Sequence, residues 1–186
     1  MSEALRLRKL GYAVAPIPRN TQAYEEGKWR KDFDKTGLVN LFQTVEIERL
    51  EVTIKSLAGL AVLNVERDWL GRKGFKELES RFGPFPKTVE MQDESLRTML
   101  FSRMGVDFPS FIPLAPEVDL VNYHIYVMVP PGTKDYRLSW ADGRALGETP
   151  IAPLPKKLME FLKSQYPQEP GRFDLLGTED HQGYRA

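Results

Sequence analysis

The spacing of apolar residues alternates along the chain between a helical period and a strand-like period. Apolar residues at helical spacing predict helices over residues 2–10, 46–57, 74–82 and 154–161. Runs rich in β-branched and aromatic residues predict strands over residues 12–18, 60–66, 88–91, 98–103 and 136–140, and one or two strands within 118–129. Stretches with glycine, proline or many charges predict irregular connections over residues 19–37 and 108–116.

Residues at the predicted helix ends support these boundaries. Ser2 is a favourable N-cap for the first helix, and Gly11 follows its last turn. Gly83 and Pro84 end the helix over 74–82, because a residue before proline disfavours the helical conformation. Several predicted strands follow one another with no helix between them. This order favours an α+β architecture over a sheet built from alternating strands and helices.

The strand predicted over residues 60–66 carries the most informative polar pattern. Asn64 and Glu66 are two residues apart and so project from the same face of that strand, with Leu63 and Val65 on the other face. Two carboxylates so placed would form half of a divalent-metal site, but Asn64 is an amide. A plainer interpretation is that Asn64 is a strand-end residue hydrogen-bonded to a neighbouring turn.

Composition narrows the class of protein. The 186 residues suit one large domain or two small lobes, and 41% apolar residues provide for a sizeable core. No apolar run reaches the length of a membrane span, and charged residues interrupt the N-terminal segment where a signal peptide would be apolar. The chain has no cysteine, which excludes disulfides and thiolate metal sites and fits a cytoplasmic location.

The net charge is zero, so composition alone does not indicate a nucleic-acid-binding protein. Residues 1–31, however, hold seven Lys or Arg residues and three Glu, a net charge of +4. Lys28, Arg30 and Lys31 end this segment and are the candidates for a phosphate-facing edge. The alternative is an ordinary solvated face.

Most familiar catalytic patterns are absent from the sequence. No glycine-rich phosphate loop is present, and His124 and His181 do not have the spacing of metal ligands. Asp119, which lies in a predicted strand, is the remaining acidic candidate, although an exposed strand residue is an equally good interpretation.

The order of several segments is similar to that of a known family. These segments are residues 4–17, 56–66, 74–89, 127–140 and 150–158. In their order and spacing the chain resembles the bifunctional DNA primase–polymerase domain of the archaeo-eukaryotic primase superfamily, in the form carried by plasmids, phages and other mobile elements. The resemblance covers roughly Ala4 to Phe161. It implies mixed and antiparallel sheets with flanking helices, forming two lobes around a cleft, over residues 1–163. The polar composition of residues 164–186 predicts a flexible tail.

The resemblance also implies a chemistry. In the family an Asp-x-Asp pair and a third acidic residue hold two divalent cations, Mg²⁺ or Mn²⁺, and a Ser-x-His element contacts the phosphates of the nucleotide. Asn64 and Glu66 match the pair, and Asp119 matches the third acid by spacing, with Glu117 as the choice if the register slips. Glu66 and Asp119 are therefore the candidate metal ligands.

The nucleotide-binding element matches less well. Ser95, Arg97 and Thr98 occupy the corresponding positions, with no glycine in the turn over residues 92–97 and Thr98 where the family has histidine. The residues therefore favour a catalytically weak or inactive replication module that binds DNA or helps assemble a replication complex. Two alternatives stay open, an active primase or polymerase and a protein-interaction domain. The expected partners are single-stranded or primer–template DNA, a nucleoside triphosphate, and a helicase or other replication protein, with no membrane.

Overall fold

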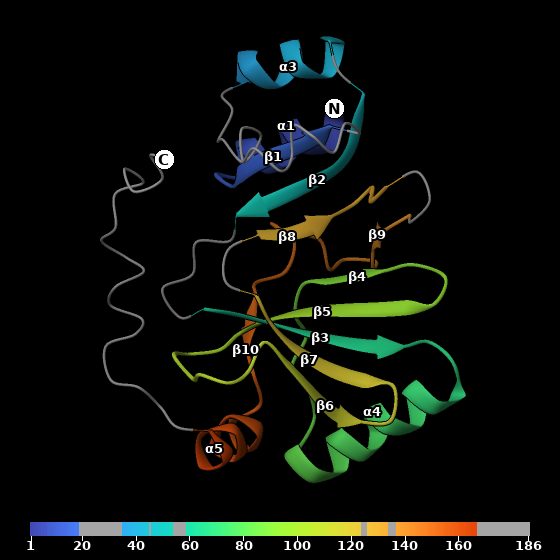
Figure 1. The fold of residues 1–186 in the computed structure, drawn as a ribbon, viewed down its shortest axis with the longest axis vertical. Helices are drawn as coiled ribbons and strands as arrows, with labels where there is room; N and C mark the ends of the chain where they lie inside the picture. Colours follow the sequence, from blue (N-terminus) through green and yellow to red (C-terminus); the bar gives the residue numbers. More distant parts are fainter. Residues whose placement is uncertain (19–34, 45, 54–58, 124–125, 134–136, 167–186) are drawn as a thin grey trace, which may run out of the picture.

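The computed structural model describes residues 1–18, 35–44, 46–53, 59–123, 126–133 and 137–166. These residues form four helices and ten strands, and the strands make two separate sheets (Figure 1). All strand pairs but one are antiparallel. The predicted α+β class is therefore confirmed. No helix within the described ranges is long and apolar enough to cross a membrane.

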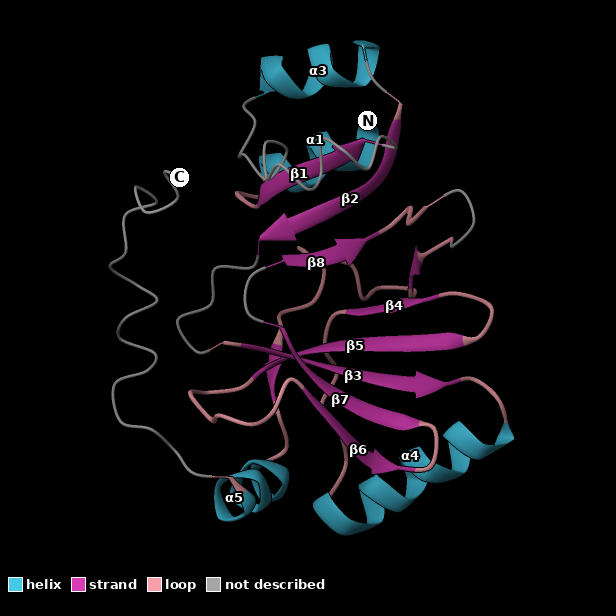
Figure 2. Ribbon diagram, in the orientation of Figure 1, coloured by secondary structure: helices cyan, strands magenta, loops and turns pink. Residues whose placement is uncertain are grey.

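The smaller sheet has three strands in the order β1-β2-β8. They are β1 (Ala13–Pro18), β2 (Ile47–Thr53) and β8 (Tyr126–Val129). Helices α1 (Ser2–Lys9) and α3 (Lys35–Thr44) lie beside this sheet (Figure 2). Apolar side chains of α1, β1, β2 and β8 meet in one core, among them Leu7, Val14, Leu50 and Val129.

The larger sheet has seven strands, with the order β6-β7-β3-β5-β4-β9 and β10 paired to β5 in parallel. These strands are β3 (Leu60–Glu66), β4 (Glu90–Gln92), β5 (Leu96–Ser102), β6 (Phe111–Ala115), β7 (Val118–Tyr123), β9 (Ser139–Trp140) and β10 (Ala152–Pro153). The other two helices, α4 (Trp69–Phe82) and α5 (Lys156–Gln165), lie beside this larger sheet (Figure 2).

Strand β3 lies between β5 and β7 and takes part in both cores of the molecule. Leu63 and Val65 pack with the core that contains α4 and α5. Val62 projects from the opposite face into the core shared with the smaller sheet. Because side chains alternate along a strand, Asn64 and Glu66 continue the Val62 face, where both are partly exposed. The predicted alternation is confirmed.

Two predicted elements are wrong. The helix predicted over residues 46–57 is strand β2 as far as Thr53, and residues 54–58 lie outside the described ranges. Pairing with β1 on one side and β8 on the other provides backbone hydrogen bonds that outweigh the helical spacing of the apolar residues. The irregular connection predicted over 108–116 contains strand β6, where Pro113 is tolerated because β6 is an edge strand.

Helix boundaries shifted in several places. Met1 rather than Ser2 is the N-cap of α1, without a side-chain hydrogen bond. Helix α3 begins inside the loop predicted over 19–37, of which residues 19–34 are not among those described. Helix α4 begins at Trp69, ahead of the predicted residue 74, because the Asp68 carboxylate accepts a 2.8 Å hydrogen bond from the Gly71 amide.

The remaining predicted elements are present with shifted bounds: the strand predicted over 136–140 is only Ser139–Trp140, and the helix predicted over 154–161 is Lys156–Gln165. Strand β10 was not predicted. Gly11 follows α1 with a φ of 89°, as expected of a glycine beyond a helix end. The segment 118–129 divides into β7 and β8, which belong to different sheets. The tail predicted over 164–186 begins within α5, and its residues 167–186 are outside the described part of the chain.

Candidate functional site

Four chain segments meet at the end of the larger sheet where β3 ends. They are the end of β3, the start of α4, the β4–β5 turn and the β6–β7 turn (Figure 1). Two backbone hydrogen bonds hold the turns to β3. The Glu66 amide donates to the Glu117 carbonyl at 3.0 Å, and the Arg67 amide donates to the Ser95 carbonyl at 2.7 Å. Polar residues from separate parts of the sequence are thereby fixed around Glu66.

Three polar residues form a row across the Val62 face of the sheet. Asn64 lies opposite Asp119 of β7 on one side and opposite Thr98 of β5 on the other. The Thr98 hydroxyl donates a 3.1 Å hydrogen bond to Asn64 Oδ1. Asp119 rather than Glu117 therefore occupies the strand position beside Asn64, whereas Glu117 lies in the turn before β7 with a φ of 55°.

Glu66 is the centre of a group of acidic residues. Burial raises its pKa above the usual value, and the negative charges of neighbouring residues raise it further; in decreasing order of effect these are Glu117, Asp68, Asp93 and Asp119. Burial also raises the pKa of Asp119. Nearby like charges and desolvation both disfavour an ionised carboxylate. The raised pKa of Glu66 therefore reflects several carboxylates gathered at this end of the sheet.

The β4–β5 turn is built around one aspartate. Asp93 Oδ1 accepts hydrogen bonds from the amides of Ser95 and Leu96 at 2.6 and 2.7 Å, and one from the Ser95 hydroxyl at 3.0 Å. The Arg67 guanidinium donates to the Asp93 carbonyl. Ser95 is thus an exposed turn residue whose hydroxyl is engaged within its own turn.

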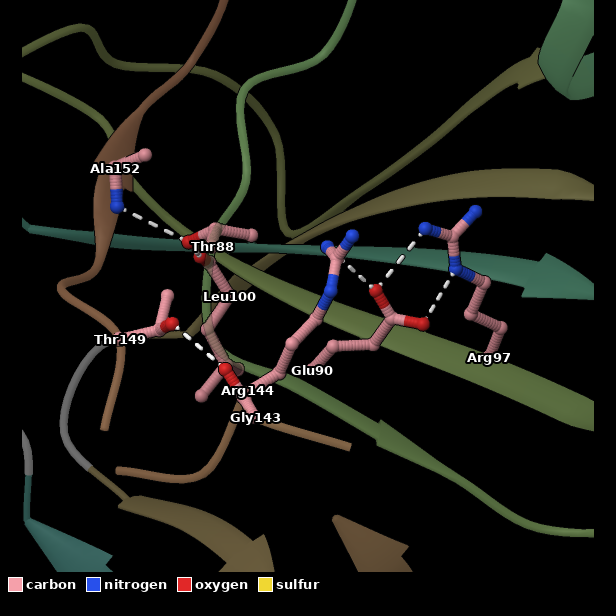
Figure 3. Close-up of polar contacts among 8 residues, drawn as sticks. All are labelled: Thr88, Glu90, Arg97, Leu100, Gly143, Arg144, Thr149 and Ala152. Carbon is pink, nitrogen blue, oxygen red and sulfur yellow. Dashed lines mark hydrogen bonds and ion pairs between the residues drawn. The ribbon is translucent and has the colours of Figure 1, made fainter. Parts of the chain in front are cut away.

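The structure separates Arg97 from the other predicted site residues. Arg97 precedes Thr98 on β5 and so projects from the opposite face of the sheet, where its guanidinium lies 5.1 Å from the Phe75 ring of α4. There it makes two hydrogen bonds, of 2.7 and 3.0 Å, to the carboxylate of Glu90 (Figure 3). Asn64, Glu66, Thr98 and Asp119 thus share one face, and Arg97 does not.

The other predicted nucleic-acid contacts, Lys28, Arg30 and Lys31, lie outside the described residues. Sequence reasoning missed the contributions of Asp68 and Asp93 to the acidic group. Asp68 had a local signal, because aspartate directly before a helix is a favoured N-cap. Asp93 follows a strand and precedes Glu94 and Ser95, a composition typical of a turn, but only the folded chain places it near Glu66.

The donor atoms on this face do not fit a two-metal centre. Among the residues that the structure describes, no group of three acidic or histidine side chains is placed so that it could hold a metal ion. The central position of the row is an amide, and one lone pair of its oxygen already accepts the Thr98 hydroxyl. Mg²⁺ requires near-octahedral oxygen ligands, usually with carboxylates among them. Glu66 and Asp119 alone would provide too little negative charge to hold two divalent cations.

The raised pKa of Glu66 leads to a prediction for stability. The ionised form of Glu66 is less favourable in the folded chain than in the unfolded chain. At a pH above the folded-state pKa, the ionised carboxylate therefore lowers the free energy of unfolding. This destabilisation disappears when the pH falls below the pKa of Glu66 in the unfolded chain. We expect Glu66→Gln to raise the free energy of unfolding at neutral pH by up to about 1 kcal/mol. Urea denaturation at neutral and mildly acidic pH measures the difference, which should shrink in acid.

Glu94→Gln is the matched control, because Glu94 is an exposed acid in the neighbouring turn and is not among the charges that raise the pKa of Glu66. It should leave the free energy of unfolding nearly unchanged at both pH values. A Glu66→Gln variant that is less stable than the wild type at neutral pH would contradict the prediction.

Comparison with protein families matches residues 4–157 to Prim-Pol, described as the N-terminal domain of bifunctional DNA primase/polymerase. No curated protein matches the chain. The family match covers most of the sequence and includes every segment of the site, from β3 through β7, as well as the smaller sheet. The chain therefore belongs to the Prim-Pol family.

Proposed function

We propose that this domain is a DNA-binding, primase–polymerase-like module of a replication protein, with little or no nucleotidyl transfer of its own. The observation that carries the proposal is Asn64. It stands at the centre of the polar row between Asp119 and Thr98, and its side-chain oxygen accepts a hydrogen bond from Thr98. By the resemblance to the family, this position is that of the first metal-binding aspartate.

An amide at that position removes one of three negative charges from the expected metal-binding set. Two-metal nucleotidyl transfer relies on the metals to activate the attacking hydroxyl and to neutralise the triphosphate. Loss of one positioned charge-stabilising group typically lowers the rate by roughly 10²–10³. The glutamate at position 66 and the threonine at position 98 are further departures, and their effects do not simply multiply.

DNA binding is supported by membership of the family, which is described as a bifunctional DNA primase/polymerase domain. Binding of the phosphate backbone needs basic and polar groups rather than a complete metal centre. A domain that has lost catalysis can therefore keep a binding surface, and a role in the assembly of a replication complex follows from that binding.

The proposal predicts binding without synthesis. We expect a fluorescein-labelled oligothymidylate to bind the purified protein with an affinity that falls as salt rises, because bound phosphates release counterions. We expect primer extension on a primer–template to stay at background with either Mg²⁺ or Mn²⁺. Fluorescence anisotropy and gel-based extension measure the two outcomes.

The Glu66→Ala/Asp119→Ala double variant is the control for catalysis. Extension by the wild type that disappears in this variant would show an active primase or polymerase and overturn the inactive assignment. Absence of salt-sensitive binding by the wild type would instead favour the protein-interaction domain. The Asn64→Asp variant restores the missing carboxylate, and we expect it to bind Mn²⁺ more tightly than the wild type in calorimetry.

A further inference from the structure

The outer face of α4 combines an exposed aromatic residue with a row of cations. Trp69, Arg72, Lys73 and Lys76 are spaced so that they share one side of the helix, and all four are exposed. The opposite side of α4 is buried against the larger sheet through Gly71, Gly74, Leu78 and Phe82. We call the four exposed residues the Trp69 face.

Trp69 is unusually exposed for a large apolar side chain. It is 65% exposed, more than any other large apolar residue in the described part of the chain, and the adjacent Leu70 is 41% exposed. The ammonium of Lys73 lies 5.5 Å from the centroid of the indole ring. Packing inside the domain does not account for this side chain, since most of its surface is open to solvent. An exposed aromatic residue beside cations is typical of surfaces that bind a partner.

The exposed side of α4 around Trp69 is basic, and the acidic group around Glu66 lies at the start of the same helix. Residues 67–76 contain four Lys or Arg residues and one acid, Asp68, whose carboxylate is engaged in capping α4. Lys73 pairs with Glu77 at 4.0 Å, and among the described residues no ion pair involves Arg72 or Lys76. A partner with regularly spaced negative charges and flat hydrophobic groups is complementary to this surface.

Helix α4 holds the Trp69 face next to the candidate site. Gly71 approaches the end of β3 so closely that a β-carbon on it would lie 2.7 Å from the carbonyl carbon of Glu66. Gly74 approaches the β6–β7 turn in the same way, and a β-carbon there would lie 3.0 Å from a methyl group of Val118. The first turns of α4 are therefore fixed to the segments that carry Glu66 and Glu117.

We propose that the Trp69 face is a stacking platform for single-stranded nucleic acid. A base stacks on the exposed indole of Trp69, and the phosphates that follow it lie along Arg72 and Lys76. Stacking on an aromatic side chain tolerates any base, and nearby cations follow the backbone, which is how sequence-independent binders hold a single strand. This inference rests on the proposed DNA binding and names the surface that carries it.

The test compares three variants of the Trp69 face with two matched controls. Trp69→Ala should weaken binding of the labelled oligothymidylate about ten-fold or more, and Trp69→Phe should restore much of the affinity, because stacking needs only an aromatic ring. Arg72→Ala/Lys76→Ala should lower the slope of log affinity against log salt by about 1.4, or about 0.7 for each lost phosphate contact. All three variants change exposed side chains, and circular dichroism checks their folding.

The controls change similar side chains elsewhere. Met104→Ala removes an apolar side chain that is 58% exposed, and Lys156→Ala/Lys157→Ala removes two exposed cations from α5. Both should bind the oligonucleotide like the wild type. If the wild type binds and Trp69→Ala binds equally well, the platform is overturned while DNA binding stands. If the wild type itself does not bind, the proposed function fails and the platform fails with it.

Discussion

Gly71→Ala is expected to lower the free energy of unfolding by about 3 kcal/mol, at the upper end of the cost of overpacking. The new β-carbon would overlap the carbonyl oxygen of Glu66 and lie 2.7 Å from its carbonyl carbon. These are backbone atoms at the end of β3, so they cannot move aside as a flexible side chain would. In an unconstrained helix the same change would stabilise the protein by about 1 kcal/mol, because alanine is the better helix former. A lower free energy of unfolding would therefore show that α4 packs too closely against β3 to accept a β-carbon at position 71.

Urea denaturation measures this change, with Ser80→Ala as the control. Ser80 is an exposed residue of α4, and alanine there should stabilise the helix slightly or leave it unchanged. Because α4 also carries Trp69, displacement of its first turns by Gly71→Ala should weaken oligonucleotide binding even in protein that remains folded. If the Gly71→Ala variant were as stable as the wild type or more stable, the close packing of α4 against β3 at this position would not be required for stability.

The face of β3 that carries the site was predictable from its sequence. Burial on one side forces Leu63 and Val65 inward, and strict alternation then places Asn64 and Glu66 together on the other side. The same rule bears on the nucleotide-binding prediction. Arg97 and Thr98 are consecutive residues of β5 and must project from opposite faces, so at most one of them can line the row with Asn64.

Long-range pairing was not predictable in the same way. The spacing of apolar residues around Leu50 fits a helix, but the segment is a strand because β1 and β8 pair with it from distant parts of the chain. The acidic group around Glu66 depends equally on tertiary structure, since Asp93 and Glu117 come from turns that only the register of β5 and β7 brings to the end of β3. The spacing of the family's motifs suggested Asp119 as the third acidic residue, and the register between β3 and β7 places it opposite Asn64.

Glu90 is the buried charge that joins the larger sheet to the loop after β9. Its side chain is 7% exposed and binds two guanidinium groups, with Arg97 at 2.7 Å and Arg144 at 3.0 Å (Figure 3). Its backbone is held to the same loop, since its amide donates to the Arg144 carbonyl and its carbonyl accepts from the Ala141 amide. Beside it, the buried Thr88 hydroxyl donates to the Leu100 carbonyl and accepts from the Ala152 amide at 3.0 Å.

Glu90→Ala is expected to lower the free energy of unfolding by about 3 kcal/mol, because removing one partner of a buried ion pair leaves the other charges uncompensated. Arg97 and Arg144 keep side-chain exposures of 29% and 28%, so both can recover part of their hydration, which holds the loss at the low end of the usual range. Glu90→Gln keeps the shape and one acceptor oxygen and should cost less. Urea denaturation of both variants provides the comparison.

A double-mutant cycle with Arg144→Ala separates the ion pair from simple loss of packing. If Glu90 acts through the two guanidinium groups, Arg144→Ala should cost clearly less in the Glu90→Ala background than in the wild type, with a coupling energy of about 1 kcal/mol or more. Lys87→Ala, which removes an exposed cation shortly before β4, is the control and should show no coupling. Additive effects of Glu90→Ala and Arg144→Ala would contradict the role of Glu90 as the common partner of these arginines. Because Arg97 also lies against Phe75, loss of Glu90 should loosen the contact between β5 and α4, the helix that carries the Trp69 face.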